Sequence, residues 1–212
     1  MKSETLPLEY GVLLEWIEAG ASVLDLGCGD GELLSLLVRE KKVKAQGIEI
    51  DDQAIHRCVA RGLSVFHQDI DDGLSEYGDL SFNYVILNQS FQQVRKPDVV
   101  LTEALRVSEK VIISFPNFAH YHGRVQIFFK GRAPITPSLP YEWHDTPNLH
   151  FLSVRDFMEY CEQRDITMER SSFVGKDRRI KLLPNLFALI GIFLISKRSV
   201  KPASSLLKEE RE

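Results

Sequence analysis

This chain has few cysteines, no long apolar run and no excess of positive charge. The three cysteines, Cys28, Cys58 and Cys161, are scattered and form neither a zinc spacing nor a disulfide framework, so a reducing cytoplasmic location is expected. Residues 1–18 lack the basic start and apolar stretch of a signal peptide. The apolar run 186–195 is shorter than the roughly 20 residues of a membrane span, and it predicts a buried strand instead.

The balance of charge argues against a nucleic-acid or membrane partner. The chain has 26 Lys and Arg against 30 Asp and Glu, a net charge of −4, and contains no basic run long enough to suggest nucleic acid. Its 212 residues can form one domain with a sizeable core, which we expect over 1–197. The charged residues 198–212 should form a solvated tail.

The most informative segment is a glycine-rich loop after a short apolar strand. Residues 23–26 run into Gly27, Gly29 and Gly31, spaced G-x-G-x-G, and a helix-forming run follows at once. The glycines let the backbone turn sharply and approach a ligand, and the helix N-terminus offers unpaired N–H groups. This pattern predicts a nucleotide-type binding loop, and Cys28, whose small size fits packing inside the loop, is assigned to the same ligand-binding set.

Acidic residues beside this loop indicate which nucleotide it should bind. Asp25 precedes the loop, Asp30 lies inside it, and the third glycine comes one residue earlier than in the dinucleotide pattern G-x-G-x-x-G. Carboxylates here would repel a pyrophosphate but suit an ammonium group. S-adenosylmethionine carries an ammonium and a sulfonium and no phosphate. We therefore expect S-adenosylmethionine, or S-adenosylhomocysteine, as the ligand.

Two further carboxylates end predicted strands where such a ligand needs them. Glu49 ends a strand at 45–49 and can accept from both ribose hydroxyls, although NAD proteins share an acid at this point. Asp69 follows a strand at 64–67 and can accept from the adenine amino group. Ile70 should pack on the ring and supply a backbone N–H, and Ile50 is assigned to the same pocket.

Strand and helix signals alternate along the chain. Helices are expected at about 8–19, 31–40, 52–61 and 97–107, and strands at 23–26, 45–49, 64–67, 82–87 and 110–115. This alternation predicts a parallel sheet with helices on both faces and the ligand outside the carboxyl ends of the strands. Strands at about 167–174 and 186–196 follow the last helix with no helix between them, which suggests an antiparallel pair at the edge.

The segment 116–152 is too long for an ordinary connection. Its many aromatic residues predict a packed segment, with a short helix or a buried turn at 125–129. Because the strands at 82–87 and 110–115 end here, we expect it to cover the methyl end of the ligand. Ser153, with Asp156 three residues on, resembles a capping box and restarts regular structure.

Histidines in this segment raise the question of chemistry. The polar set is His120, His122, His144, Asp145 and His150. Its spacing is weak for a metal site, and none is expected. A neutral imidazole could take a proton from a methyl acceptor, with His150 the leading candidate for such a base. The preferred alternative is that these side chains hydrogen-bond the loop backbone and hold the segment in shape.

Several motifs resemble those of one family. The loop at 23–34, together with Glu49 and Asp69, resembles the class I S-adenosylmethionine-dependent methyltransferase superfamily. Five other segments resemble the MetW family within it: 83–93, 114–118, 139–143, 145–150 and 155–157. The resemblance runs from about Tyr10 to Lys197. It implies a Rossmann-like α/β fold with a mostly parallel seven-stranded sheet, an antiparallel last strand and helices on both faces.

The resemblance also assigns residues around the methionine end of the ligand. Asn88 and Gln89 end the fourth strand, where many superfamily enzymes bind the acceptor or the methionine moiety, and Tyr10 matches a position that could hydrogen-bond the methionine carboxylate. The Asn-Gln-Ser-Phe sequence at 88–91 lacks the Asn/Asp-Pro-Pro-aromatic pattern of enzymes that methylate bases or glutamine. Asn83 stands where the superfamily usually has aspartate.

Two interpretations of function stay open. The resemblance implies a partner of the homoserine O-acetyltransferase MetX in methionine biosynthesis. Because it carries no methyl acceptor with it, the pocket would sense the end product of that pathway. Exposed apolar surface on 116–152 would then be the interface. The alternative is a methyltransferase that acts on a small molecule. The first interpretation is preferred, and whether the chain is an enzyme stays open.

Overall fold

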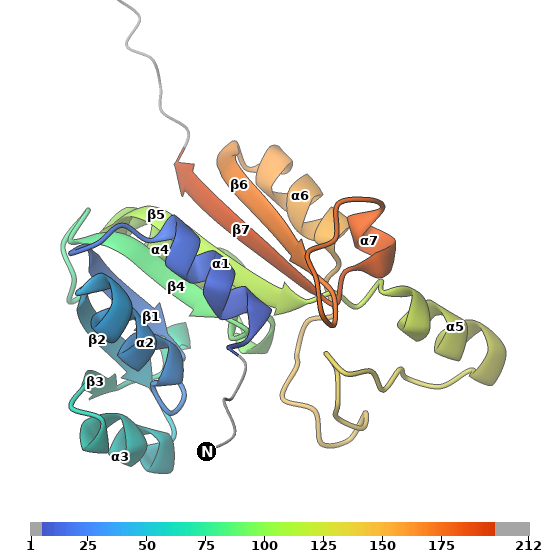
Figure 1. The fold of residues 1–212 in the computed structure, drawn as a ribbon, viewed down its shortest axis with the longest axis horizontal. Helices are drawn as coiled ribbons and strands as arrows, with labels where there is room; N and C mark the ends of the chain where they lie inside the picture. Colours follow the sequence, from blue (N-terminus) through green and yellow to red (C-terminus); the bar gives the residue numbers. More distant parts are fainter. Residues whose placement is uncertain (1–5, 198–212) are drawn as a thin grey trace, which may run out of the picture.

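A twisted seven-stranded sheet forms the centre of the computed structural model, which describes residues 6–197 (Figure 1). The strands are β1 (Ser22–Leu26), β2 (Lys44–Glu49), β3 (Ser64–His67), β4 (Phe82–Asn88), β5 (Ser108–Pro116), β6 (Ile166–Val174) and β7 (Ile190–Lys197). Their order is β3-β2-β1-β4-β5-β7-β6, with parallel pairs from β3 to β5, and β7 antiparallel to both of its neighbours. The predicted fold class is confirmed, while the predicted tail 198–212 lies outside the described residues.

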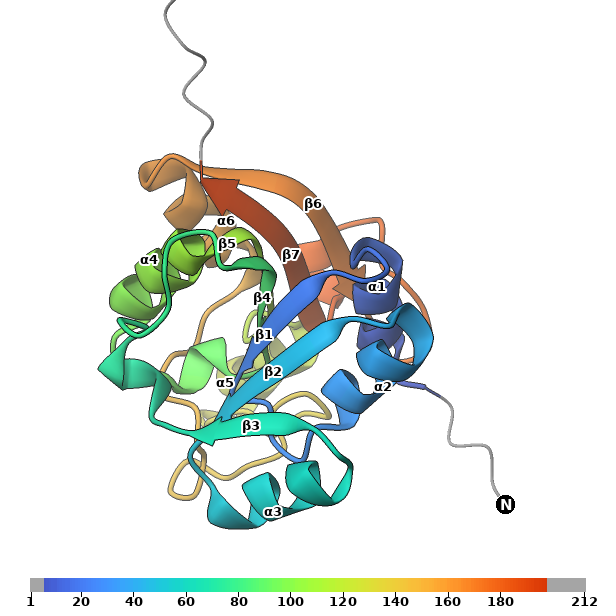
Figure 2. The same cartoon turned by 90° about the vertical axis from the view of Figure 1, so that its left-hand side faces the viewer.

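Helices cover both faces of this sheet (Figure 2). They are α1 (Leu8–Trp16), α2 (Glu32–Lys41), α3 (Asp52–Ala60), α4 (Pro97–Val107), α5 (Tyr121–Lys130), α6 (Val154–Gln163) and α7 (Pro184–Phe187), with 3-10 turns η1 (Ile70–Asp72) and η2 (Phe91–Gln93). Residues of α1, α2 and α3 share one core with the sheet, whereas α4 and α6 contribute to the core on the other face. Within 6–197, no helix is long and apolar enough to cross a membrane.

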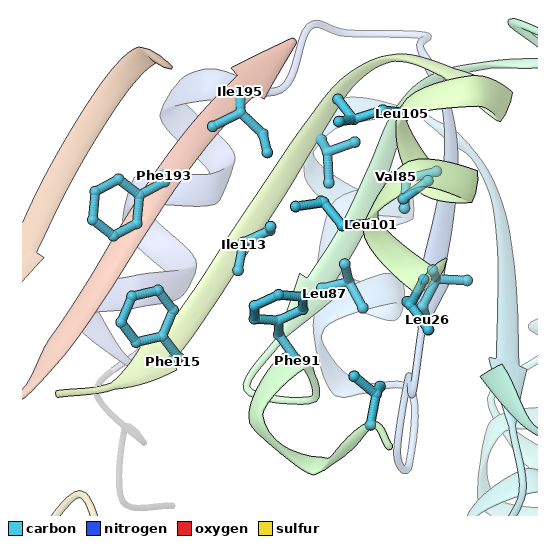
Figure 3. Packing of buried hydrophobic residues seen from close by; sticks show 14 of the residues in the cluster. Leu26, Val85, Leu87, Phe91, Leu101, Leu105, Ile113, Phe115, Phe193 and Ile195 are labelled. Atoms are coloured by element: carbon cyan, nitrogen blue, oxygen red, sulfur yellow. The ribbon is translucent and has the colours of Figure 1, made fainter. Parts of the chain in front are cut away.

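Alternate side chains along β4 pack into the two cores on opposite faces of the sheet. Tyr84 and Ile86 belong to the cluster with α1 and α2, whereas Val85 and Leu87 belong to the cluster with α4. Figure 3 shows Val85 and Leu87 beside Leu101 of α4, in the cluster that extends to Phe115 and Phe193. Burial on both faces holds the central strands in a fixed register, so their carboxyl ends form a rigid base for a site.

The predicted starts of α3, α4 and α6 are confirmed. The side chain of Asp51 accepts from the N–H of Ala54 at 2.7 Å and caps α3. Ser153 and Asp156 form a capping box at the start of α6, since each side chain accepts from the other residue's N–H, at 3.2 and 2.8 Å. Pro97 occupies the first turn of α4.

Two predicted boundaries are wrong. The strand predicted at 186–196 begins only at Ile190, because Pro184–Phe187 form the short helix α7 with proline in its first turn. An apolar run alone does not distinguish a strand from a helical turn, which explains the error. The opening helix ends at Trp16 instead of residue 19, since Ile17 is already extended (φ −81°, ψ 128°).

The segment 116–152 contains the predicted short helix, but the alternative of a buried turn is wrong. Helix α5 projects beyond the end of the sheet (Figure 1), and Gly123 is its only buried residue. Phe128 and Phe129 are 81% and 77% exposed. Packing of Phe128 and Phe129 therefore does not hold this part of the segment. Hydrogen bonds contribute instead, such as the one from the Phe118 N–H to the Leu152 carbonyl at 3.1 Å and those between the Gln126 side chain and the Ile135 backbone.

Asn83 joins the starts of β1 and β4, which gives this departure from the superfamily pattern a structural role. Its Oδ1 accepts from both the N–H and the hydroxyl of Ser22 at 3.0 Å, and its own N–H donates to the Ser22 hydroxyl at 2.9 Å. An aspartate would offer the same acceptor atom. The amide at this position therefore preserves the contact between the two strands without a charge.

We expect Asn83→Ala to lower the free energy of unfolding by about 1–2 kcal/mol, because two Ser22 donors lose their acceptor. Asn83→Asp keeps an acceptor and should stay within about 0.5 kcal/mol of the wild type. Urea unfolding of the three proteins measures this difference. Equal stability of Asn83→Ala and the wild type would contradict the role of the contact.

Candidate functional site

A cavity of about 400 Å³ opens at the carboxyl ends of the parallel strands. It lies beside β1 and β4, where the strand order reverses, the usual ligand position in open α/β sheets. Its volume is within the range of small-molecule sites. The lining residues are Gly27, Gly29, Glu49, Ile50, Gln68, Asp69, Ile70, Asp71, Gln89, Ser90, Gln93, Val94 and Arg95.

Glu49, at the end of β2, holds the glycine loop against the rim of this cavity. Its Oε2 accepts from the N–H of Gly29 at 2.7 Å. Its Oε1 accepts from the N–H groups of Ile50 and Asp51 at 2.8 and 3.0 Å. A carboxylate has about four acceptor positions, so these three bonds leave about one for a ligand hydroxyl. Accepting from two ribose hydroxyls, as predicted, would require one backbone donor to be released.

Two glycines of the loop are needed for different reasons. Gly27 has a φ of 76°, and a Cβ there would lie 2.9 Å from the Cβ of Ser90. Gly31 has a φ of 75°, and a Cβ there would lie 2.4 Å from Leu63 Cδ1 and 2.8 Å from Cys58 Sγ. The first glycine lets the loop approach β4, and the second lets α2 begin close to α3. Gly31 does not line the cavity.

Cys28 turns away from the cavity into the core between β2 and α2. A Cβ added at Gly47 would lie 2.6 Å from its sulfur and 3.1 Å from Leu34. Burial, together with the nearby Asp25 and Cys58, raises the pKa of the Cys28 thiol. The thiol is therefore a packing group with no thiolate character.

The walls of the cavity carry more negative than positive charge. Glu49, Asp69 and Asp71 contribute carboxyl groups, against the single guanidinium of Arg95. This excess suits a cationic ligand and disfavours a pyrophosphate. Asp30, which the charge argument from sequence also used, does not line the cavity and forms an exposed ion pair with Arg61 at 3.2 Å.

The carboxylates of Asp69 and Asp71 also shape the wall. Asp69 caps η1 by accepting from the N–H of Asp71 at 2.9 Å. Both oxygens of Asp71 accept from the N–H of Arg95, at 3.0 and 2.9 Å, and one also accepts from Lys96. These bonds tie the turn after β3 to the chain after β4, and they close one side of the cavity.

Asp25 is a buried carboxyl group beneath the glycine loop. It is 2% exposed, and its Oδ1 has no hydrogen-bond partner among the described residues. Burial, and next the negative charge of Glu49, raises its pKa to about 7. A buried carboxyl with unused acceptor capacity beside an acidic cavity is a good partner for a cationic group.

Of the residues assigned to the methionine end, the structure brings Gln89 to the cavity. Gln89 has a φ of 56°, and its side-chain amide donates to Glu9 of α1 at 2.6 Å. Asn88 instead accepts from the Ser114 hydroxyl at 2.6 Å, and the Tyr10 hydroxyl lies 3.5 Å from Glu32. Neither Tyr10 nor Asn88 lines the cavity, so their predicted contacts with a ligand stay predictions.

His150 links the segment 116–152 to the cavity wall. The ring Nε2 of His150 lies 3.0 Å from the carbonyl oxygen of Val94, and the backbone N–H of His150 donates to the Gln92 carbonyl at 3.0 Å. Because a carbonyl oxygen only accepts, Nε2 carries the proton. This geometry agrees with the preferred structural role of the histidines, and a base role for His150 stays a prediction. No cluster of His, Cys, Asp or Glu within residues 6–197 could hold a metal ion.

Six lining residues were not predicted from the sequence. They are Gln68, Asp71, Ser90, Gln93, Val94 and Arg95. The spacing Asp-Ile-Asp at 69–71 was a usable signal, since Asp71 follows the predicted adenine contact by two residues. Residues 93–95 are brought to the wall by the turn η2, for which the hydrophobic pattern gives no signal.

Comparisons with known proteins identify the family. A sequence model described as methionine biosynthesis protein MetW matches residues 8–195. A curated relative, the bifunctional methionine biosynthesis protein MetXA/MetW of Rhodopirellula baltica, is 34% identical over 190 residues and covers 85% of this chain. The chain belongs to the MetW family. It spans 30% of the length of that relative, so the MetW-like part is one portion of a longer protein there.

Solved structures confirm the fold of this MetW family member. A SAM-dependent methyltransferase from Archaeoglobus fulgidus superposes with a TM-score of 0.65 at 15% identity, covering 90% of this chain and 92% of that one. Another, from Thermotoga maritima, gives a TM-score of 0.64 at 16% identity, covering 90% and 88%. At such low identity the likeness shows the class I methyltransferase fold alone.

Asp25 should make stability depend on pH. Its pKa of about 7 lies above the ordinary 3.8, so the folded state binds more protons between these values and stability falls as pH rises through this range. Asp25→Asn removes the charge. We expect the variant to be more stable than the wild type by about 1–3 kcal/mol at pH 8, with the difference shrinking toward pH 4. Urea unfolding at pH 5 and pH 8 measures this, and a difference independent of pH would contradict it.

Proposed function

We propose that this protein binds S-adenosylmethionine in the acidic cavity and acts with the homoserine O-acetyltransferase MetX in methionine biosynthesis. The observation that supports this choice of ligand is the excess of carboxyl groups around the glycine loop. Glu49, Asp69 and Asp71 line the cavity, against Arg95 as the single basic residue. A dinucleotide would bring two phosphates to these carboxylates, whereas S-adenosylmethionine brings two positive charges, one carboxylate at its methionine end and no phosphate.

The cavity offers one contact for each part of the ligand. Glu49 accepts from a ribose hydroxyl with its remaining acceptor position. Asp69 accepts from the adenine amino group, while Ile70 packs on the ring. The methionine end points toward Gln89, and its ammonium is stabilised by the buried carboxyl of Asp25. Asp25 lies behind the residues that line the cavity, and the ammonium would give its unpaired Oδ1 a hydrogen-bond partner.

The proposed partner is supported by the relative from Rhodopirellula baltica, whose name places MetXA and MetW in one chain. Joining two proteins in one chain raises their effective concentration and is of most use when they act together. In a separate MetW-family chain the same association needs an interface. We propose that both proteins meet in the cytoplasm and that S-adenosylmethionine, made from methionine, reports the supply of the end product to the acyltransferase.

Calorimetric titration with S-adenosylmethionine tests the cavity. We expect Glu49→Gln and Asp69→Asn each to weaken binding about 10-fold or more, because each removes a charge-assisted hydrogen bond. Asp52→Asn is the matched control, since its exposed carboxyl caps no helix and lies outside the cavity. NAD should not bind. Unchanged affinity in both cavity variants, or tighter binding of NAD, would contradict the assignment.

Co-elution with the purified homoserine O-acetyltransferase of the same organism tests the partner. Size-exclusion chromatography with light scattering should show a complex whose mass is the sum of both proteins. Incubation of that complex with S-adenosylmethionine and homoserine should release no S-adenosylhomocysteine, because the proposal assigns the cavity to binding. Separate elution would contradict the partnership, and catalytic release of S-adenosylhomocysteine would show a methyltransferase instead.

A further inference from the structure

Helix α5 and the loop after it expose large apolar side chains on one end of the molecule. Phe128, Phe129 and Trp143 are 81%, 77% and 79% exposed. Val125, Ile127 and Tyr141 are each between 45% and 49% exposed. We call these six residues the aromatic surface. Single exposed apolar residues are ordinary, but a group of three nearly uncovered aromatic rings marks an interaction surface.

The helix that carries this surface is poorly supported by the rest of the fold. Only Gly123 among the ten residues of α5 is buried. A helix of this length is marginal in water, and most helices in proteins are stabilised by packing of an apolar face. Its attachments in residues 6–197 include two hydrogen bonds between the Gln126 side chain and the backbone of Ile135, at 2.8 and 3.1 Å. A partner that packs on α5 would supply the missing burial.

A cavity of about 490 Å³ lies next to these exposed rings. Its walls include Phe118, Ile127, Leu139, Tyr141, Trp143 and Phe151. Ile127, Tyr141 and Trp143 of the aromatic surface line this hollow, whereas Phe128 and Phe129 stand exposed on α5 outside it. Such a combination fits a protein partner that inserts a bulky apolar side chain and receives the phenylalanines in return. A flat lipid surface would not fill the hollow.

A group of basic residues near the start of α5 indicates the chemistry of the partner, whereas Glu142 and Asp145 flank Trp143 itself. Residues 116–152 and 175–189 contain seven Lys and Arg and three Asp and Glu, although acidic residues outnumber basic ones in the whole chain, 30 to 26. Lys176, Arg178 and Lys181 line a hollow of about 990 Å³ that also touches Tyr121 and His122 of α5. A partner with acidic residues around its apolar contact would be attracted. A second copy of this chain would bring its own basic residues to the same place.

The segment 116–152 is also joined by hydrogen bonds to the wall of the acidic cavity. The N–H groups of Leu149 and His150 donate to the Gln92 carbonyl at 2.9 and 3.0 Å, and His150 also contacts Val94, which lines the cavity. Trp143 and Leu149 lie six residues apart in this segment. These hydrogen bonds tie the wall of the acidic cavity to the segment that carries Trp143.

We infer that the aromatic surface docks the homoserine O-acetyltransferase, through an apolar segment of that enzyme flanked by acidic residues. This inference rests on the proposed function, because the partner is taken from it. It adds the face of the molecule that makes the contact. The rings of Phe128 and Phe129 are the central contact, with the hollow beside Trp143 receiving the partner's side chain.

The test measures binding of the purified acyltransferase to three variants. In Phe128→Ser/Phe129→Ser and in Trp143→Ser, we expect the dissociation constant to rise by at least about 30-fold, as for buried aromatic residues at the centre of an interface. Val59→Ser is the matched control, since Val59 is 60% exposed on α3, away from α5 (Figure 1). It should bind within about twofold of the wild type. Unchanged affinity for S-adenosylmethionine shows that each variant is folded.

Other results of these binding measurements would contradict the surface, the partner or both. Wild-type binding that survives in both aromatic variants would overturn the surface and leave the proposed function standing. Absence of wild-type binding would overturn the partner and, with it, this assignment. Light scattering that shows a homodimer lost in Phe128→Ser/Phe129→Ser would assign the surface to a second copy. Sedimentation with vesicles of phosphatidylglycerol and phosphatidylcholine, lost in the same variant, would assign it to a membrane.

Discussion

The structure of the site depends on how Glu49 uses its carboxylate. Three backbone N–H groups, from Gly29, Ile50 and Asp51, converge on this one side chain at the end of β2. The glycine loop after β1 is thereby held against the neighbouring strand, and the cavity stays open between the loop and the turns after β3 and β4. Because the strands beneath are buried on both faces, this arrangement rests on a base that cannot shift easily.

Much of this arrangement could be predicted from the sequence because it follows from local patterns. The glycine spacing, the apolar strands and the acidic residue at each strand end gave the fold and the positions of Glu49 and Asp69. Residues 93–95 escaped prediction because η2 and the bonds of Asp71 bring them to the cavity, and these are tertiary effects. The apolar run at 186–189 misled for a related reason, since Pro184 starts a helical turn that periodicity does not show.

The segment 116–152 shows the limit of reading aromatic residues as core. Phe118 lies 4.9 Å from Phe151, measured between ring centroids, so part of the segment does pack on itself. Phe128, Phe129 and Trp143 instead face outward. A sequence alone does not distinguish apolar side chains that are buried in a core from those that are exposed on the surface. The distinction came from the position of α5 beyond the sheet (Figure 1), where the fold offers it little to pack against. The exposed rings are the feature of this segment on which the proposed association rests.

We propose that a row of carboxyl groups at successive strand ends recognises an adenosine compound without phosphate. A crystal structure of the protein with S-adenosylhomocysteine tests it most directly. We expect the ribose within hydrogen-bonding distance of Glu49, the adenine amino group at Asp69, and the amino-acid end beside Gln89 and Asp25. A ligand bound elsewhere, or one whose ribose contacts none of these carboxylates, would contradict the account.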